Sequence, residues 1–362
     1  MKHNVLHVGA GGFGEDWCHT FLPPNVADGT IEVVGMVDID AKALEKGRQH
    51  LGLKVEQCFT SAEHAFQTVD ADFCTIVIPP AWHESIVDLA IARNMHILSE
   101  KPIADTMEAS VRIAEKVRAA GLKMGVTMSH RFDQDKSTLR ALVGADALGR
   151  INTVSCRFAG DFRVYDSWGR FRHEMVHPML IEGAVHHLDI MVDLAGAPCT
   201  AIYARTWRPD WAEYKGDTDV MVVMDFANGA HGVYEGSSAQ ATGLNGWGRE
   251  YFRVEAGAGT AILDHREIEV FHRDPKRIYQ HNRQGRGQQI SLLPGEKWKN
   301  SLLIEQFCRW LDGGPPMATN VEDNLQSVAL VFSAIESARL GEPVKVQEFL
   351  HSFRNSASNQ AQ

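Results

Sequence analysis

The sequence predicts an α/β plus α+β protein: an N-terminal α/β domain with a parallel sheet, and a C-terminal domain with a large, mostly antiparallel open sheet. Short apolar runs alternate with helix-like segments from Val5 to Thr127, and strand-like runs dominate after residue 150. The 362 residues, with 44% hydrophobic content, exceed one typical domain. We expect domains at 1–128 and 129–350, and a final helix at about 321–340 that packs back toward the first domain. A tail follows at 351–362, and we expect it to be frayed from Asn355 onward.

The first domain is predicted from five apolar runs of strand length. They are Val5–Val8, Glu32–Val37, Phe73–Ile78, Met95–Leu98 and Met124–Thr127. Helix-like stretches at Asp40–Leu51, Trp82–Arg93 and Thr106–Ala120 separate several of them. This alternation predicts βαβ units, in which helices cover both faces of a parallel sheet.

A glycine-rich turn follows the first strand and opens a helix. Its residues are Gly9, Gly11, Gly12, Phe13 and Gly14. Glycines at this spacing allow a tight turn, close approach of the backbone to a pyrophosphate and close packing of helix on strand. The pattern therefore favours a Rossmann domain that binds a dinucleotide, and a purely structural turn is the alternative.

Asp38, at the end of the second strand, bears on the choice of dinucleotide. A carboxylate there accepts hydrogen bonds from ribose hydroxyls and repels a 2′-phosphate. The next residue is Ile39 rather than an arginine that could pair with that phosphate. NAD is therefore favoured over NADP; alternatively, Asp38 only caps the helix that begins near Asp40.

Two more motifs lie at strand ends of the same sheet. Ile78-Pro79-Pro80 is a stiff loop that could border the nicotinamide ribose, and His83 either contacts the cofactor or caps its own helix. Glu100-Lys101-Pro102 follows the run Met95–Leu98 and directs an ammonium group into the crevice of an open α/β sheet. We therefore place Lys101 at the reacting centre.

The second domain is predicted from six strand-like runs. They are Ile151–Phe158, Val220–Phe226, Gly229–Glu235, Tyr251–Ala256, Thr260–Leu263 and Ile268–Phe271. Asn228-Gly229 between two of these runs is a hairpin signal.

Glu182 and His186 are the candidate acid/base pair of this domain. A spacing of four residues places both side chains on one face of a helix. A histidine there can take a proton near neutral pH. The alternatives are a packed core histidine and a carboxylate that only stabilises a helix N-terminus.

His173-Glu174-Met175-Val176-His177 matches a zinc metalloprotease pattern, H-E-x-x-H. That pattern needs a continuous helix to bring both imidazoles to one metal ion. Pro178 disfavours helical geometry in the residue before it, so we expect no metal site there. His173 or His177 could instead line the substrate pocket.

Taken in order, these motifs resemble the glucose–fructose oxidoreductase and inositol dehydrogenase family (Gfo/Idh/MocA). The resemblance also covers Ser129-His130-Arg131-Phe132, the segment Glu182–Asp189 and the segment Glu336–Gly341. It implies that Lys101 hydrogen-bonds the reacting hydroxyl and that His186 is the acid/base. Inositol dehydrogenases of that family have aspartate where this chain has Glu182, which leaves the exact substrate contact open. The resemblance also implies a homodimer or homotetramer formed through the C-terminal sheet.

From the motifs and the resemblance we expect the following site residues. The cofactor contacts are Gly9, Gly11, Gly12, Phe13, Gly14, Asp38, Ile39, Ile78, Pro79, Pro80, His83, Glu100 and Lys101. The substrate contacts are Lys101, His130, Arg131, Arg163, Trp168, Glu182 and His186. Arg170 and Arg172 join Arg163 and Trp168 near the expected pocket mouth, although such arginines are often only solvated. Tryptophan faces suit sugar rings, so the expected substrate is a sugar, a sugar acid or a cyclitol.

Composition narrows the partners. A net charge of −10 argues against nucleic acid or an anionic membrane as the main partner. Six cysteines without a C-x-x-C pair, no signal peptide and no membrane-length apolar run indicate a cytoplasmic protein.

Three functions fit the sequence. The first is an NAD-dependent dehydrogenase in which Lys101 polarises the hydroxyl and His186 moves the proton. The second is a redox-neutral, NAD-dependent glycoside hydrolase that acts by transient oxidation and elimination. The third is a non-catalytic NAD-binding regulator, which would have no need for Lys101 and His186.

Overall fold

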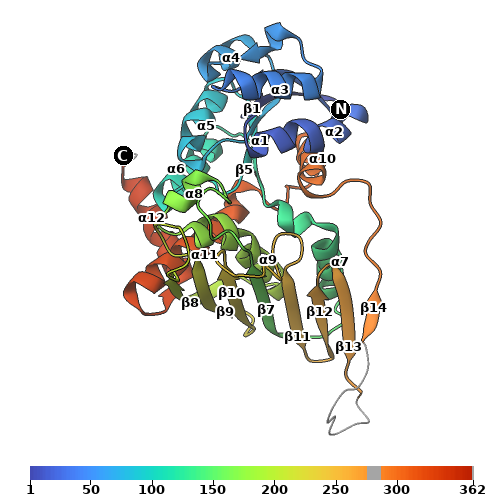
Figure 1. Cartoon of the computed structure of the whole chain (residues 1–362). Coiled ribbons are helices and arrows are strands. Elements are labelled where there is room, and N and C mark those ends of the chain that lie inside the picture. Colours follow the sequence, from blue (N-terminus) through green and yellow to red (C-terminus); the bar gives the residue numbers. More distant parts are fainter. Residues whose placement is uncertain (275–286, 361–362) are drawn as a thin grey trace. The chain divides into compact units, whose positions relative to one another are not determined.

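The computed structural model of the chain describes residues 1–274 and 287–360 (Figure 1). The described residues form two compact units. The first contains residues 1–132, 296–328 and 353–360, and the second contains residues 133–295 and 329–352. Residues 296–328 thus belong to the first unit, although the boundaries expected from the sequence assign them to the second domain.

The first unit is built on a six-stranded sheet with the order β3-β2-β1-β4-β5-β6. All neighbouring strands are parallel, which confirms the predicted doubly wound sheet. The strands are β1 His3–Val8, β2 Ile31–Val37, β3 Cys58–Phe59, β4 Phe73–Ile76, β5 His96–Glu100 and β6 Met124–Thr127. The two-residue β3 is absent from the sequence prediction because so short a pairing leaves no hydrophobic period.

Helices α3 and α6 of the first unit begin at side-chain caps. Asp40 accepts a hydrogen bond from the amide of Lys42 at the start of α3, and Thr106 accepts one from the amide of Ala109 at the start of α6. The helical segments are α1 Phe13–Asp16, η1 Trp17–Phe21, α2 Pro23–Ala27, α3 Ala41–Leu51, η2 Val55–Gln57, α4 Ala62–Thr68, η3 Pro80–Trp82, α5 His83–Ala92, α6 Met107–Ala119, η4 Ser129–Phe132 and α10 Lys299–Leu311.

Helix α10 completes the core of the first unit, although it follows β1 by almost 300 residues. Its Phe307 is fully buried and contacts Phe73 of β4 edge-on, with ring centroids 5.2 Å apart. Leu303 and Ile304 of the same helix are also fully buried in that core.

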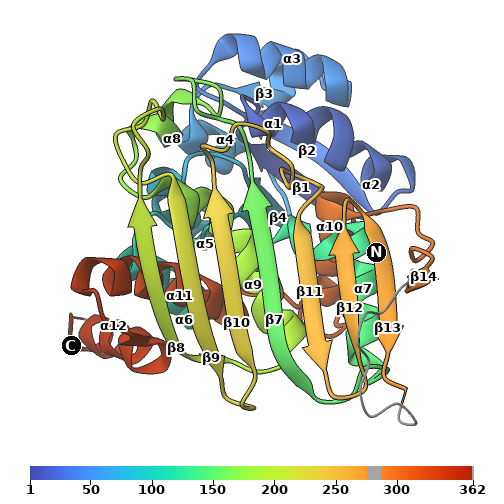
Figure 2. The same cartoon turned by 60° about the horizontal axis from the view of Figure 1, so that its bottom comes forward.

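The second unit is built on a nine-stranded sheet with the order β14-β13-β12-β11-β7-β10-β9-β8-β15 (Figure 2). Among the described strands of this sheet, only β7 and β10 pair in parallel, so the predicted, mostly antiparallel sheet is confirmed. The strands are β7 Ile151–Ala159, β8 Cys199–Trp207, β9 Asp219–Phe226, β10 His231–Ser237, β11 Tyr251–Ala256, β12 Gly259–Asp264, β13 Glu267–His272, β14 Gln288–Ile290 and β15 Val344–Lys345.

All six predicted strands of this sheet are present within two residues of their expected ends. The turn at Asn228-Gly229 joins β9 to β10, and Gly229 has a φ of +83°. The nine-residue β8 is missing from the prediction, because Thr200, Arg205 and Thr206 interrupt its apolar residues. The helical segments here are α7 Gln134–Gly144, α8 Arg170–Glu174, η5 Met179–Ala184 and α9 Val185–Ala195.

Two helices close the described chain. Helix α11 covers Val321–Leu340, the range expected for the last helix, and has residues in both units. Residues 351–360 of the expected tail continue α12, Val346–Gln360. That helix is anchored because Val346 and Leu350, one turn apart, are buried. Residues 361–362 lie outside the described residues. Among the described helices, none has the length and hydropathy of a membrane span.

Candidate active site

The glycine turn of the first unit leaves no room for side chains at two positions. Gly9 has a φ of +97°, and a Cβ atom there would lie 2.1 Å from the carbonyl oxygen of Val77. A Cβ atom at Gly14 would lie 2.3 Å from the carbonyl oxygen of Gly9. The backbone therefore packs in the way that a dinucleotide turn requires. Phe13, which begins α1, is 47% exposed beside this turn.

The carboxylate of Asp38 is hydrogen-bonded to the backbone of the glycine turn. Its Oδ2 accepts hydrogen bonds from the amides of Ala10 (2.6 Å) and Gly11 (3.0 Å), and its Oδ1 accepts one from the amide of Asp40 (2.8 Å). The cap of α3 is Asp40 rather than Asp38. Ile39, the residue after Asp38, is 92% exposed to solvent.

The loop after β4 is held by His83. The imidazole is fully buried, with Nε2 2.8 Å from the carbonyl oxygen of Ile78 and Nδ1 3.1 Å from that of Ile103. The side chain of Trp82, the residue that precedes this helix, makes no capping bond. The His83 ring ties the loop Ile78-Pro79-Pro80 to the segment after β5, a role that the sequence prediction did not include.

Glu100, the last residue of β5, is buried, and burial raises the pKa of its carboxyl group. Its Oε1 accepts hydrogen bonds from Trp17 Nε1 and from Asn300 Nδ2, both at 3.0 Å, and its Oε2 accepts one from the amide of Lys101 (3.2 Å). Glu100 therefore fastens the Lys101 backbone to η1 and α10. Sequence reasoning places Glu100 among cofactor contacts and gives no sign of these bonds.

His130 and Arg131 lie on η4, which ends the N-terminal stretch 1–132 of the first unit. The guanidinium of Arg131 is almost completely buried and lies 3.9 Å from Asp323 at the start of α11. Arg131 is therefore paired with a carboxylate of its own unit, and its role as a substrate contact stays a prediction.

Glu182 and His186 lie on one continuous helical segment of the second unit. Glu182 is in the π-helical η5, and His186 is in the first turn of α9. Both side chains are buried to 5% exposure. π-helical turns often occur at functional sites, so this departure from α-helix favours a functional role for the segment.

Arg172 is the ion partner of Glu182. Its Nε and Nη2 lie 3.0 and 2.9 Å from Glu182 Oε2, and its Nη1 donates to the carbonyl oxygen of Trp168 (2.9 Å). The guanidinium also lies over the Trp168 ring, 5.2 Å from its centroid. Glu182, Arg172 and Trp168 therefore form one packed group.

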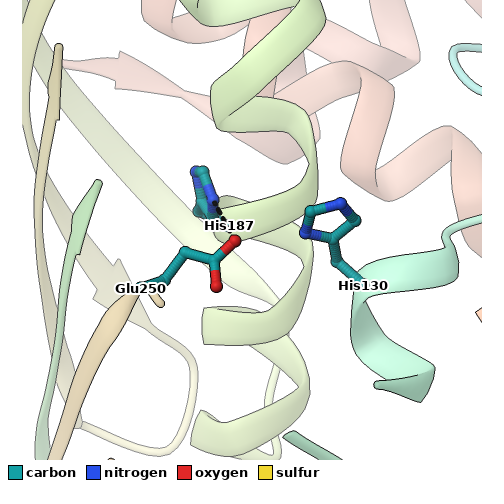
Figure 3. A group of neighbouring side chains, drawn as sticks. All are labelled: His130, His187 and Glu250. Atoms are coloured by element: carbon teal, nitrogen blue, oxygen red, sulfur yellow. Dashed lines mark ion pairs between the residues drawn. The ribbon is translucent and has the colours of Figure 1, made fainter. Parts of the chain in front are cut away.

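Trp247 joins this group to the histidines of α9. Its ring is 6.1 Å from Trp168 and meets His186 edge-on, at 6.1 Å and 85°. The adjacent His187 stacks on Trp247 at 5.7 Å, and its Nε2 lies 3.9 Å from Glu250 Oε1 (Figure 3). The sequence gives no sign that Trp247 lies against His186, because the two residues are about sixty positions apart.

The other predicted residues of this unit lie apart from that group or on its edge. Arg163 pairs with Asp161, and Arg170 pairs with Asp166 and is 76% exposed. His173 is fully buried, stacks on Tyr214 and binds the carbonyl oxygen of Glu213. Helix α8 ends at Glu174 and Met175 is extended, so His173 and His177 do not share a helix, as H-E-x-x-H requires.

Comparisons with known proteins agree with this geometry. Residues 3–128 match the model of an oxidoreductase family with an NAD-binding Rossmann fold, GFO/IDH/MocA. Residues 137–261 match the model of the GFO/IDH/MocA C-terminal domain.

Similar proteins match nearly end to end. An uncharacterized protein of Sinorhizobium fredii, y4oX, is 82% identical, over 99% of both chains. A D-apiose dehydrogenase of Rhizobium rhizogenes is 23% identical over 95% of this chain and 97% of that protein. The solved structure of an oxidoreductase from Agrobacterium radiobacter, in complex with NAD+, L-tartaric acid and magnesium, has a TM-score of 0.83 at 21% identity, covering 96% of this chain and 99% of that one. The chain belongs to the Gfo/Idh/MocA family of NAD-binding oxidoreductases.

Proposed function

We propose that this chain is an NAD-dependent dehydrogenase that oxidises a secondary alcohol or the anomeric carbon of a sugar, a sugar acid or a cyclitol. The observation that carries the proposal is the group in the second unit that joins His186 and Glu182 to Trp168, Trp247 and Arg172. It combines a proton acceptor with aromatic faces and fixed charges, which suits a ring that carries hydroxyl groups. The relative named D-apiose dehydrogenase supports a sugar substrate.

The first unit fits a dinucleotide because Gly9 and Gly14 leave a cradle that any Cβ atom would fill. NAD held there would supply the acceptor for the hydride that leaves the carbinol carbon. The carboxylate of Asp38 would repel a 2′-phosphate, and no cation stands at Ile39 to balance it, so we propose NAD rather than NADP.

The chain's own residues would handle the proton and the charge. Lys101 Nζ would donate a hydrogen bond to the reacting hydroxyl oxygen and stabilise the negative charge that develops there. A ring nitrogen of His186 would accept the hydroxyl proton. Glu182, which has Arg172 as its ion partner, would accept a hydrogen bond from a neighbouring hydroxyl group and so orient the ring.

The test is a screen with the purified full chain. Myo-inositol, D-glucose, D-galactose, D-glucuronate and D-galacturonate would each be offered with NAD and with NADP, and NADH formation followed by absorbance. We expect net NADH formation with at least one of them. Cleavage of an aryl glycoside without any NADH accumulation would instead establish the redox-neutral glycosidase.

Variants test the assigned roles. Lys101→Met and His186→Asn should each lower kcat by about 10²-fold or more, because each removes a group that acts on the moving proton or charge. NAD affinity should change by less than about twofold. His231→Gln on β10 is the control for His186→Asn, since His231 is exposed and pairs with Asp225. Full activity in either variant would overturn the assigned mechanism.

A further inference from the structure

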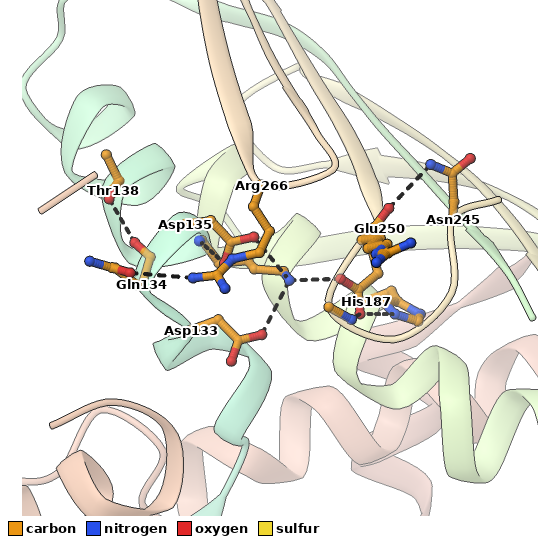
Figure 4. A network of polar contacts seen from close by, with 11 residues as sticks. Asp133, Gln134, Asp135, Thr138, His187, Asn245, Glu250 and Arg266 are labelled. Carbon is orange, nitrogen blue, oxygen red and sulfur yellow. Dashed lines mark hydrogen bonds and ion pairs between the residues drawn. The ribbon is translucent and has the colours of Figure 1, made fainter. Parts of the chain in front are cut away.

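Lys136 is a charged side chain that the proposed reaction does not use, and it is 1% exposed. Its Nζ lies 2.7 Å from Glu250 Oε2, 3.2 Å from Asp133 Oδ2 and 3.4 Å from Asp135 Oδ2. Figure 4 labels these three carboxylates. Burial opposes the ammonium charge, but the three carboxylates raise the pKa of Lys136 above its ordinary value. Lys136 is therefore a permanent cation inside the second unit.

Glu250 links Lys136 to the loop before β11. While Oε2 binds Lys136, Oε1 accepts a hydrogen bond from the amide of Gly248 (3.1 Å). On the other side of the loop, Asn245 accepts a bond from Arg157 Nη1 (2.9 Å) and donates to Asp264 Oδ1 and to the carbonyl oxygen of Arg249 (both 3.2 Å). The loop is thus fixed on both sides of Trp247.

The residue held between these anchors is the one that contacts the candidate acid/base. Trp247 packs on Phe158 of β7 at 4.4 Å and on His187 at 5.7 Å, and its ring meets His186 edge-on. His187 is itself fixed by Tyr234, whose hydroxyl lies 2.9 Å from His187 Nδ1. A shift of the loop would therefore change the surroundings of His186 on its tryptophan side.

We propose that Lys136 and Glu250 are positioning residues that hold Trp247 against His186, and that Trp247 is a specificity-determining residue that contacts the substrate ring. The proposal rests on the role of His186 given under the proposed function. A buried ion pair is a costly way to fill a core, because apolar residues of similar volume often stabilise a fold equally well. Here the pair instead supplies directed bonds from α7 to one loop.

The experiment compares Lys136→Met with Arg140→Met. Arg140 lies one turn further along α7 and also forms an ion pair within the second unit, with Asp193 of α9. Lys136→Met should raise the KM for the most rapidly oxidised sugar of the screen, and lower kcat/KM, by about tenfold, with the KM for NAD unchanged. Trp247→Ala should reproduce that loss, and Trp247→Phe, which keeps an aromatic ring, should recover part of it. Arg140→Met should keep the sugar KM within about twofold.

A double variant distinguishes loss of positioning from unfolding caused by an unpaired buried charge. Lys136→Met leaves Glu250 buried without its cation, whereas Lys136→Met with Glu250→Gln removes both charges. We expect the double variant to fold and still show the raised sugar KM. A merely structural pair would lower the active fraction and leave both KM values unchanged. A folded double variant with the wild-type sugar KM would overturn the proposal.

Hydrogen exchange of the chain without substrate separates this proposal from the proposed function. The amides of residues 245–250 should exchange faster in Lys136→Met and in the double variant than in Arg140→Met. Unchanged exchange there would overturn the positioning role even if His186 proves essential. If these amides exchange faster in the Lys136 variants but His186→Asn is active, the positioning role of Lys136 is upheld. The assignment of His186 as the acid/base is then overturned.

Discussion

Replacing Gly9 with alanine tests whether the first turn is shaped for a dinucleotide. Gly9 has a φ of +97°, where an L-residue costs about 1–2 kcal/mol. The added Cβ would also lie 2.1 Å from the carbonyl oxygen of Val77, at least 0.9 Å inside the 3.0 Å limit of real contacts. Relief of that overlap adds about 1–3 kcal/mol, so Gly9→Ala should destabilise the protein by about 2–5 kcal/mol.

The same shift should withdraw backbone amides from the pyrophosphate. Loss of one or two hydrogen bonds to a charged group, about 1.5–3 kcal/mol each, would weaken NAD binding by roughly ten- to a thousandfold or more. Isothermal titration calorimetry with NAD gives the Kd, and thermal unfolding reports the loss of stability.

Two glycines separate the causes. Gly52→Ala carries the backbone cost alone, since its φ is +65° and its Cβ would meet nothing within 4 Å. Gly14→Ala carries the overlap, with its Cβ 2.3 Å from the carbonyl oxygen of Gly9. We expect Gly14→Ala to impair NAD binding and Gly52→Ala to leave it intact. If Gly9→Ala binds NAD as tightly as Gly52→Ala does, the turn does not hold the pyrophosphate.

Three further predictions concern single side chains. Asp38→Asn should weaken the binding of NAD and narrow the preference for NAD over NADP, because it removes the charge that repels a 2′-phosphate. Asp40→Asn changes only the cap of α3, so it should leave the ratio of the Kd values for NADP and NAD unchanged. Arg172→Met should raise the KM for the sugar by about tenfold, because Glu182 loses its ion partner. Arg170 is exposed, so Arg170→Met should leave this KM unchanged. Equal KM values for the two variants would refute the role of Arg172. Burial lowers the pKa of His7 to about 4, against 6.5 in the unfolded chain, so the unfolded state binds more protons between these values and stability should fall, by up to about 3 kcal/mol, as pH drops from 6.5 to 4. His7→Leu should flatten that dependence of the unfolding temperature on pH, and an equally steep slope would exclude His7 as its source.

The parts of the fold that the sequence predicts are those set by neighbours along the chain. Gly9 and Gly14 predict a turn because its local geometry requires glycine. Strands β1, β2 and β4 to β6 appear as apolar runs because both faces of a parallel sheet are buried. The spacing of Glu182 and His186 likewise predicts that they share one helical segment, although not that part of it is a π-helix.

The parts that remain hidden depend on partners far apart in sequence. Lys136 meets Glu250 across 114 positions, and Asn300 meets Glu100 across 200. A lysine in an amphipathic helix has the same sequence pattern whether it is solvated or buried, so only the fold reveals these pairs. His83 shows the same limit, because its two carbonyl partners come from irregular segments that have no period.

The return of residues 296–328 to the first unit has a consequence for synthesis on the ribosome. Domains generally fold as units while the chain emerges from its N-terminus. Here Phe307 and Asn300 complete a core and a carboxylate site whose other members, Phe73 and Glu100, were made some 200 residues earlier. The first unit therefore lacks α10 until strands β7 to β14 of the second sheet have been translated. A chain truncated after residue 128 would leave Leu98 and Phe73 without α10, so exposed apolar surface and aggregation are the expected fate of that fragment.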